Sequence, residues 1–172
     1  MGNTESKENW VVGLVSSDMD SPVGQLKLVA HRHALVAVLW QNEKLNRVIL
    51  PALIQDDSHP ILMGAKQQLD EYFNGRRKVF DVPLDFQGTP FQRQVWQALL
   101  TIPFGETRTY QEIAVQIGNP KAVRAVGAAN GRNPISILTP CHRVIGSNGR
   151  LVGFAGGLEN KKILLHIESI EF

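Results

Sequence analysis

Cysteine is nearly absent from this chain of 172 residues, and long apolar runs are missing altogether. The single cysteine, Cys141, cannot form an internal disulfide, and no apolar leader or membrane-length segment is visible. Both absences argue against secretion and membrane insertion, so we expect a reducing, cytoplasmic location. Residues 1–6, MGNTES, match the form of a myristoylation site, but no cysteine or basic cluster follows nearby to complete a membrane anchor. We therefore expect no membrane partner.

Charge is distributed unevenly between the two halves of the chain. Residues 1–87 contain 9 Lys and Arg against 11 Asp and Glu, whereas residues 88–172 contain 9 against 5. The overall net charge of +2 therefore combines a slightly acidic first half with a basic second half. A basic surface suits a polyanionic partner such as nucleic acid, although charge alone favours an ordinary solvated surface.

The first half has the pattern of a small antiparallel sheet covered by one helix. Turn-forming residues separate short apolar or alternating runs at residues 10–15, 25–30, 34–40 and 47–50. Over residues 59–74 apolar positions recur at helical spacing, and Gly75 follows where a left-handed cap would end the helix.

A domain boundary is expected near residue 87. Residues 78–87 predict a strand followed by a linker that contains Pro83, and the pattern after them becomes helical. We therefore expect an α+β protein. A sheet-plus-helix domain would span residues 1–87, and a helical domain would span residues 88–172.

The second half begins with two predicted helices that carry their own end signals. Thr89 and Pro90 provide an N-cap and a helix-starting proline for the first helix. Thr109 and Glu112 have the spacing of a capping box at the start of the second, and Gly118 is placed to end it.

A third helix, over residues 121–130, would complete a helix-turn-helix in a winged-helix-like domain. Asn119-Pro120 is expected to cap and start it. Most of its residues are small, and the long exceptions in or just beyond it are basic: Lys121, Arg124 and Arg132. Small residues allow close approach to a neighbouring helix or to another surface, and the basic residues favour nucleic acid. We therefore expect DNA as the partner.

Cys141 is a candidate nucleophile. It lies in residues 139–144, TPCHRV, beside His142 and Arg143. The thiolate is the reactive form of cysteine, and neighbouring cationic groups lower the pKa of a thiol. The alternative is a small buried apolar residue, which is the usual role of an isolated cysteine.

A proton relay is expected around this cysteine. Residues 136–139 are β-prone, so Cys141 and His142 are predicted to lie at the end of a strand or the start of a loop, with side chains pointing in opposite directions. A water would then carry the thiol proton to the imidazole. Glu168, on a closing helix over residues 158–168, is the candidate carboxylate for orienting His142, with an exposed surface position as the alternative.

A slot for a flat base is expected near Cys141. Residues 147–150, SNGR, contain the Asn-Gly of a tight turn, and residues 154–157, FAGG, place an aromatic ring before bare backbone. Glycine lets a ligand approach closely, and the ring can stack on a planar one. The alternative for the two glycines is an ordinary turn before a helix.

Four collinear motifs resemble the O6-alkylguanine-DNA alkyltransferases, most closely the bacterial members. They are residues 118–130 (GNPKAVRAVGAAN), 133–134 (NP), 140–146 (PCHRVIG) and 153–158 (GFAGGL). The resemblance is detailed over residues 88–168 and looser over residues 1–87. It implies DNA repair by irreversible transfer of a methyl or larger alkyl group from flipped-out O6-alkylguanine to Cys141, without a cofactor or a metal. O4-alkylthymine is a further candidate substrate.

The resemblance also implies a mode of DNA binding. Such a protein is a monomer that enters the minor groove of double-stranded DNA, and cooperative binding along the DNA stays open. Arg124 would fill the stack that the flipped base leaves. The other residues implied at the DNA surface are Tyr110, Lys121, Ala125, Gly127 and Arg132, and those implied at the base pocket are Val144, Phe154, Ala155 and Gly156.

The implied catalytic residues surround Cys141. His142 would act through a water as the base for Cys141, and Glu168 would orient His142. Asn133 would brace the active-site turn. Tyr110 would donate a proton to the leaving guanine and crowd the backbone phosphate, so that the nucleotide rotates outward.

Some positions depart from the family pattern. Many members of the family have Tyr where this chain has Phe154, Trp where it has Ile163 and His where it has Ile167. We interpret these three differences as changes in packing. Some relatives hold zinc through cysteines in the N-terminal domain. Residues 1–87 contain no cysteine, so we expect surface or structural roles for the histidines of this half, His31, His33 and His59.

Two other functions compete with alkyl transfer. Alkyltransferase-like proteins share the DNA-binding domain and recognise alkylation damage without catalysis, but they lack the cysteine that is present here as Cys141. A Cys-His hydrolase would need an oxyanion hole and a direct dyad, and it would have no use for Arg124 on a helix of small residues. Turnover separates the classes, because a hydrolase regenerates its thiol and an alkyltransferase is consumed.

Overall fold

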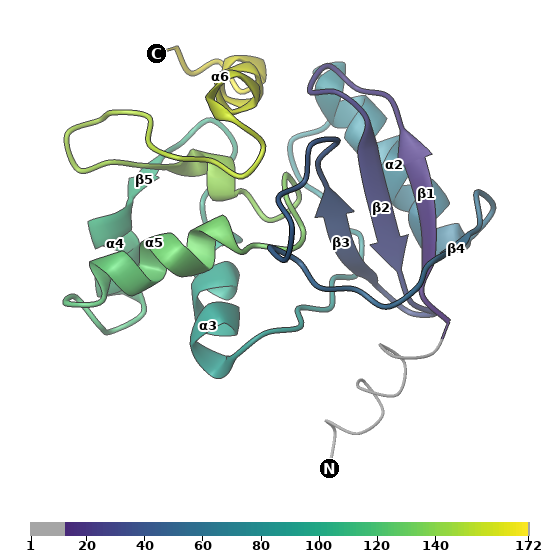
Figure 1. The fold of residues 1–172 in the computed structure, drawn as a ribbon. Helices are drawn as coiled ribbons and strands as arrows, with labels where there is room; N and C mark the ends of the chain where they lie inside the picture. The colour runs from purple at the N-terminus through teal and green to yellow at the C-terminus, as the bar shows by residue number, and fades with distance from the viewer. Residues whose placement is uncertain (1–12, 172) are drawn as a thin grey trace.

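The computed structural model describes residues 13–171. The myristoylation-like residues 1–6 therefore lie outside the described residues. A four-stranded sheet with one covering helix comes first in the chain, and a group of short helices follows beside it (Figure 1). This arrangement confirms the predicted α+β class.

The sheet has the order β3-β2-β1-β4 and is antiparallel over three strands. Its strands are β1 (Val15–Met19), β2 (Leu26–Ala30), β3 (Leu35–Leu39) and β4 (Ile54–Gln55). The prediction of an all-antiparallel sheet is wrong at one edge, because β4 pairs parallel to β1, with Val15 opposite Ile54. A parallel neighbour needs a crossover, and residues 40–53 carry the chain across.

Two of the four predicted strand ranges are wrong. Residues 47–50 form no strand, because they belong to the crossover that leads to β4. The range 10–15 ends where β1 begins, and its residues 10–12 lie outside the described residues. The runs at 25–30 and 34–40 are confirmed as β2 and β3.

Helix α2 (Pro60–Phe73) covers one face of the sheet, as Figure 1 shows. Proline suits the first position of a helix because a backbone N–H at that position has no acceptor within the helix, so its absence costs no hydrogen bond. The buried face consists of Leu62, Ala65, Leu69 and Tyr72. Gly75 follows with φ of 73°, a conformation that glycine adopts without strain, and the predicted helix and its cap are confirmed.

Residues 78–87 form no strand of their own, so the predicted strand is wrong, and the whole segment is a linker between α2 and α3. Instead Pro83 and Asp85 attach to the sheet edge at Leu35: the Leu35 amide donates to Pro83 O at 2.9 Å, and the Asp85 amide donates to Leu35 O at 2.9 Å. His31, which is buried, contacts the Asp85 carboxylate at 2.8 Å. His31 is therefore a structural residue that fixes this segment.

The helical part starts with α3 (Pro90–Leu99), and after β5 (Arg108–Thr109) come α4 (Tyr110–Gln116) and α5 (Val123–Gly131). Thr89 and Thr109 each accept from the backbone amide three residues on in a capping box, which confirms both helix starts. Helices α4 and α5 form the expected helix-turn-helix.

The expected start of α5 is wrong. Asn119 and Pro120 lie in the turn between the helices, where the Ala122 amide donates to Asn119 O at 3.0 Å. The helix begins at Val123, and Ala122 before it has no polar side-chain atom that could cap the first turn. Residues 119–122, which the sequence pattern assigned to the helix, therefore belong to the turn before it.

The chain closes with a 3-10 turn, η1 (Cys141–Arg143), strand β6 (Val144–Ile145) and helix α6 (Leu158–Ile167). Strand β6 pairs parallel to β5. A tight turn precedes α6 at Gly149, which has φ of 77°, and the Gly146 amide donates to Arg150 O at 2.9 Å. The turn predicted at residues 147–150 is confirmed.

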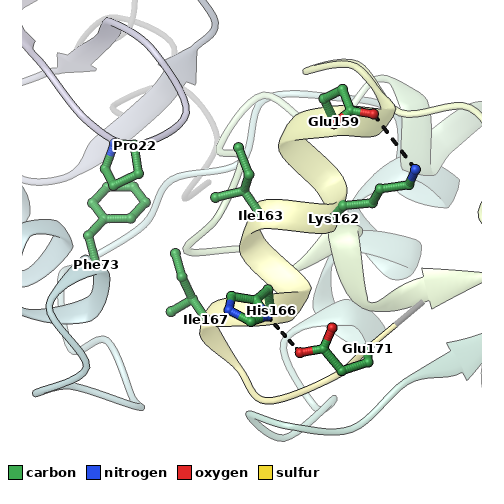
Figure 2. Close-up of a pocket in the computed structure, with 8 residues that line it drawn as sticks. All are labelled: Pro22, Phe73, Glu159, Lys162, Ile163, His166, Ile167 and Glu171. Atoms are coloured by element: carbon green, nitrogen blue, oxygen red, sulfur yellow. Dashed lines mark hydrogen bonds and ion pairs between the residues drawn. The ribbon is translucent and has the colours of Figure 1, made fainter.

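The two parts of the chain share one apolar core, which extends from the sheet through α2 to α3, α5 and α6. A cavity of about 360 Å³ lies beside α6, where Ile163 and Ile167 face Pro22 and Phe73 of the first half (Figure 2). Both isoleucines are partly buried against the core, in keeping with the packing role expected for them. Among the described helices, none is long and apolar enough to cross a membrane.

Candidate active site

The segment before the cysteine is a tight turn rather than a strand end. Ile137 has φ of 75°, and the Leu138 amide donates to Ser136 O at 2.9 Å across it, which makes a γ-turn. A β-branched residue in the left-handed region is strained, and strain of this kind occurs at functional sites. The expected extended segment at residues 136–139 is therefore wrong.

Asn133 holds this turn closed. It is fully buried, its Nδ2 donates to Thr139 O at 2.9 Å, and its Oδ1 accepts from the Ile135 amide at 3.0 Å. One side chain thus bonds to both ends of the turn, directly before Pro140 and Cys141.

Cys141, His142 and Arg143 are consecutive residues of the η1 turn, and all three are buried. Burial raises the pKa of the Cys141 thiol, and this effect outweighs the opposing hydrogen bond from Asn133 and the charges of Arg47 and Lys161. The cysteine is therefore a neutral thiol in the isolated protein, and it needs a base to become reactive.

His142 lies in a position to be that base. Its Nε2 meets Glu168 Oε2 at 2.7 Å, so the carboxylate holds the Nε2 proton and leaves the lone pair on Nδ1. Nδ1 is buried and has no hydrogen-bond partner among the described protein atoms. Burial lowers the pKa of His142 despite the favourable Glu168 contact, so the imidazole is neutral and able to accept a proton.

Glu168, at the end of α6, accepts five hydrogen bonds. Its Oε1 accepts from Arg143 Nε at 2.7 Å and from the Gly105 amide at 3.1 Å. Its Oε2 accepts from His142, from Arg143 Nη2 at 3.1 Å and from the Tyr72 hydroxyl at 2.6 Å. Burial opposes ionisation, but the contacts with His142 and Arg143 outweigh it and lower the pKa of Glu168 to about 2.

Lys161 adds a buried positive charge next to the site. Its Nζ donates to Val144 O at 2.6 Å and to Val152 O at 3.4 Å, and its side chain is fully buried. Burial lowers the pKa of Lys161 to about 8, while the nearby Cys141 opposes this shift. The lysine therefore joins β6 to the loop that leads into α6.

The helix-turn-helix presents a smooth basic surface. On α5 and at its ends Lys121, Arg124, Ala125 and Arg132 are exposed, and Gly127 is half-buried. Tyr110, the first residue of α4, packs its ring against Gly127, where an added Cβ would lie 3.8 Å from Tyr110 Cδ1. Burial and the neighbouring Cys141 raise the pKa of Tyr110, so its hydroxyl keeps its proton.

The predicted base-pocket residues fall into two groups. Phe154 and Ala155 line a cavity of about 480 Å³ together with Arg132 and the crossover residues Lys44, Leu45, Asn46 and Arg47. Val144 and Gly156 do not line it. Val144 is buried beside Lys161, and Gly156 is pressed against Trp40, where an added Cβ would lie 2.6 Å from the indole.

Sequence reasoning missed several residues that complete the site: Trp40, Arg47, Tyr72, Arg143 as a carboxylate partner, and Lys161. Arg47, for example, donates from Nη1 to Asn133 O at 2.8 Å. The first three come from the first half of the chain, and only the folded structure brings them close. For Arg143 the available signal was its place in the cysteine motif, two residues after Cys141. Lys161 stands between Asn160 and Lys162 in a polar stretch, so no local pattern marked it as buried.

No group of three or more histidine, cysteine, aspartate or glutamate side chains suited to a metal occurs within residues 13–171.

Comparison with known proteins gives two matches that together cover most of the chain. Residues 90–170 match the DNA-binding domain of 6-O-methylguanine DNA methyltransferases, and residues 14–86 match the ribonuclease-like domain of the same family. The chain belongs to this family.

Individual relatives agree with this placement. The chain is 50% identical over 151 residues to the methylated-DNA–protein-cysteine methyltransferase of Mycobacterium tuberculosis. The aligned region covers 87% of this chain and 89% of that protein. The constitutive enzyme of the same name from Bacillus subtilis is 48% identical over 157 residues, covering 89% of this chain and 94% of that protein.

Solved structures agree as well. The crystal structure of M. tuberculosis OGT in complex with DNA superposes with a TM-score of 0.82 at 48% identity, over 91% of this chain and 92% of that one. The predicted family and fold are thereby confirmed, because both halves of the chain take part in the match.

Proposed function

We propose that this protein repairs DNA by direct reversal, moving the alkyl group of O6-alkylguanine irreversibly onto Cys141. The observation that carries the proposal is the buried Cys141 next to His142, whose Nε2 is fixed 2.7 Å from the Glu168 carboxylate. Membership of the 6-O-methylguanine DNA methyltransferase family supports it. No cofactor is required, since the damaged DNA itself is the alkyl donor.

The first chemical step activates the thiol. A water between Cys141 Sγ and His142 Nδ1 carries the proton from sulfur to the imidazole. Glu168 stays ionised and balances the imidazolium that forms, while Lys161 stabilises the thiolate. This role for the water is supported by the lone pair that Nδ1 keeps when Nε2 donates to Glu168.

The second step transfers the alkyl group. The thiolate attacks the alkyl carbon, so that a carbon–sulfur bond forms as the bond from that carbon to guanine O6 breaks. The electron pair of the broken bond passes to the purine, and the Tyr110 hydroxyl donates a proton to the ring. The proton held by His142 then restores Tyr110. The products are guanine and an S-alkylcysteine, so each molecule acts once.

DNA approaches the exposed surface of α5. Ala125 and Gly127 allow the helix to lie close to the floor of the minor groove, and Lys121 and Arg132 bind phosphates. Arg124 enters the stack as the damaged nucleotide rotates out past Tyr110. Taking a base out of the stack costs a few kcal/mol, and the cost is lowest for a poorly paired lesion.

The flipped base enters between Phe154 and the η1 turn. The carbonyls of Cys141 and Val144 accept from its exocyclic amine, and the backbone near Ala155 and Gly156 meets O6. Val144 O already accepts from Lys161, and a carbonyl oxygen has two lone pairs, so it can accept a second donor. Asn133 keeps the turn before Cys141 in place.

Other parts of the proposal concern organisation. The boundary between the N-terminal and DNA-binding domains lies at residues 87 and 88, in the segment that joins α2 to α3. The protein acts as a monomer on double-stranded DNA, in the cytoplasm. It supplies its own alkyl acceptor, so Cys141 separates it from related proteins that only recognise damage.

A stoichiometry experiment tests the proposed function. With the protein limiting over a duplex that contains O6-methylguanine, the amount of restored guanine should stop at one equivalent of protein. Cys141→Ser should restore none while still binding the duplex. Continued turnover beyond one equivalent, or no restoration at all, would contradict the proposal.

A further inference from the structure

The hydroxyl of Tyr72 reaches the active-site carboxylate from the other half of the chain. Tyr72 lies on the buried face of α2, and its hydroxyl donates to Glu168 Oε2 at 2.6 Å. The two residues are separated by 96 positions in the sequence. A residue of the sheet-plus-helix part therefore takes part in the hydrogen bonds around His142.

The ring of Tyr72 is held by aromatic neighbours from both halves. The centroids of Phe73, Phe80 and Phe104 lie 5.5 Å, 5.4 Å and 6.2 Å from that of Tyr72. The residue is fully buried, so its hydroxyl has no bulk water to bond instead. Burial and the Glu168 charge raise the pKa of Tyr72, which keeps the hydroxyl a donor.

Glu168 Oε2 is shared by more donors than it has lone pairs. Tyr72, His142 and Arg143 Nη2 all donate to it, at 2.6 Å, 2.7 Å and 3.1 Å. A carboxylate oxygen offers about two lone-pair directions. The Tyr72 hydroxyl therefore competes with the His142 proton for the same oxygen and weakens the attraction between Glu168 and His142.

We propose that Tyr72 is a positioning residue for alkyl transfer: its hydroxyl fixes Glu168 Oε2 and limits how strongly the carboxylate stabilises the His142 imidazolium. This inference rests on the proposed function, since it concerns the base that activates Cys141. Alkyl transfer needs neutral His142, so Tyr72 extends activity to lower pH. The charged groups that act on His142 are Glu168, Arg143 and Lys161. Tyr72 acts on it through Glu168, and Cys141 is its neighbour in the η1 turn.

The test is Tyr72→Phe, which removes the hydroxyl and keeps the ring. The rate of methyl transfer to Cys141 is measured from pH 5 to 9 under single-turnover conditions. Without the Tyr72 hydroxyl, Glu168 stabilises the His142 imidazolium more strongly. The acidic limb of the pH–rate profile, where His142 becomes protonated, should therefore move up by about half to one pH unit. Below that limb the variant should be about 3- to 10-fold slower, with a much smaller change above it.

A matched control separates positioning from packing. Phe80→Leu removes an aromatic neighbour of Tyr72 without touching Glu168, so it should lower stability and leave the acidic limb in place. A uniform loss of rate in Tyr72→Phe, or an unmoved limb, would overturn the inference and leave Tyr72 a packing residue.

An NMR titration of the His142 ring in both proteins makes the inference testable apart from repair. The pKa of His142 should rise by the same half to one unit in Tyr72→Phe. If wild-type protein transfers no methyl group, the proposed function fails, while this titration still decides the effect of Tyr72 on His142. An unchanged His142 titration would overturn the inference.

Discussion

The indole of Trp40 meets the ring of Phe154 edge-on, with the ring centroids 5.4 Å apart. Trp40 lies just beyond β3, and its Nε1 donates to Ser136 Oγ at 3.1 Å, beside the strained turn that precedes Cys141. The first half of the chain therefore supports both Phe154, the proposed aromatic wall of the base pocket, and the turn that precedes Cys141.

We expect Trp40→Ala to weaken the packing of the Phe154 ring and the turn that precedes Cys141. Loss of a buried indole leaves a cavity and should cost about 3–5 kcal/mol of unfolding free energy. Urea unfolding measures this cost. If the protein is as stable as wild type, the packing role of Trp40 is wrong.

Gly156→Ala should disturb the same contact from the other side. An added Cβ would lie 2.6 Å from the Trp40 indole, which is too close for the side chains to stay where they are. We expect a slower methyl transfer and a lower melting temperature. The double variant Gly156→Ala with Trp40→Phe should recover part of the stability, because the smaller ring makes room. Additive losses would show that the clash is not the cause.

Stability should depend on the ionisation of Glu168. Its folded pKa of about 2 lies below the ordinary value of 4.5, so its contribution is complete above pH 4.5 and is lost as the pH falls toward 2. This contribution amounts to roughly 3 kcal/mol. Urea unfolding from pH 6 to pH 2 should show the difference between wild type and Glu168→Gln shrinking toward acid. Parallel curves for the two proteins would contradict this assignment.

Glu168→Gln should itself be strongly destabilising at neutral pH. The substitution leaves Arg143, which is 6% exposed, as a buried charge without its carboxylate. Breaking a buried pair from one side costs about 3–5 kcal/mol. The double variant Glu168→Gln with Arg143→Met should regain part of the lost unfolding free energy. A double-mutant cycle measures the coupling free energy between the two residues. Independent effects of the two substitutions would rule out the pair as the cause.

Arg124→Ala should slow repair of duplex DNA far more than repair of a single strand. The flipped base leaves a gap only in a duplex, so the filling side chain matters only there. We expect a loss of more than about tenfold on duplex O6-methylguanine and about twofold or less on the single strand. Arg76→Ala, which removes an exposed arginine next to α2, is the matched control. Equal losses on both substrates would assign Arg124 to phosphate binding instead.

The sequence predicted local features well because the responsible residues are neighbours in the chain. The capping boxes at Thr89 and Thr109 and the glycine after α2 depend on contacts within a few residues. The helix-turn-helix follows from the same signals. The cysteine motif and its resemblance to a known family identified the chemistry from residues 118–158.

Contacts between distant parts of the chain were not predictable in this way. Tyr72 is an ordinary buried position in a helical pattern, and its bond to Glu168 exists only because α2 packs against the end of α6. The parallel strand β4 depends on where the crossover ends, and the γ-turn at Ile137 contradicts the β preference of its residues. Tertiary structure outweighs local preference at these places.

The most direct test of alkyl transfer is the intact mass of the protein before and after incubation with a duplex that contains one O6-methylguanine, followed by peptide mapping. We predict a gain of one methyl group per molecule, located on Cys141, and no gain in Cys141→Ser. Tight binding to the damaged duplex without a change in mass would contradict it and would make the protein a damage-recognition module.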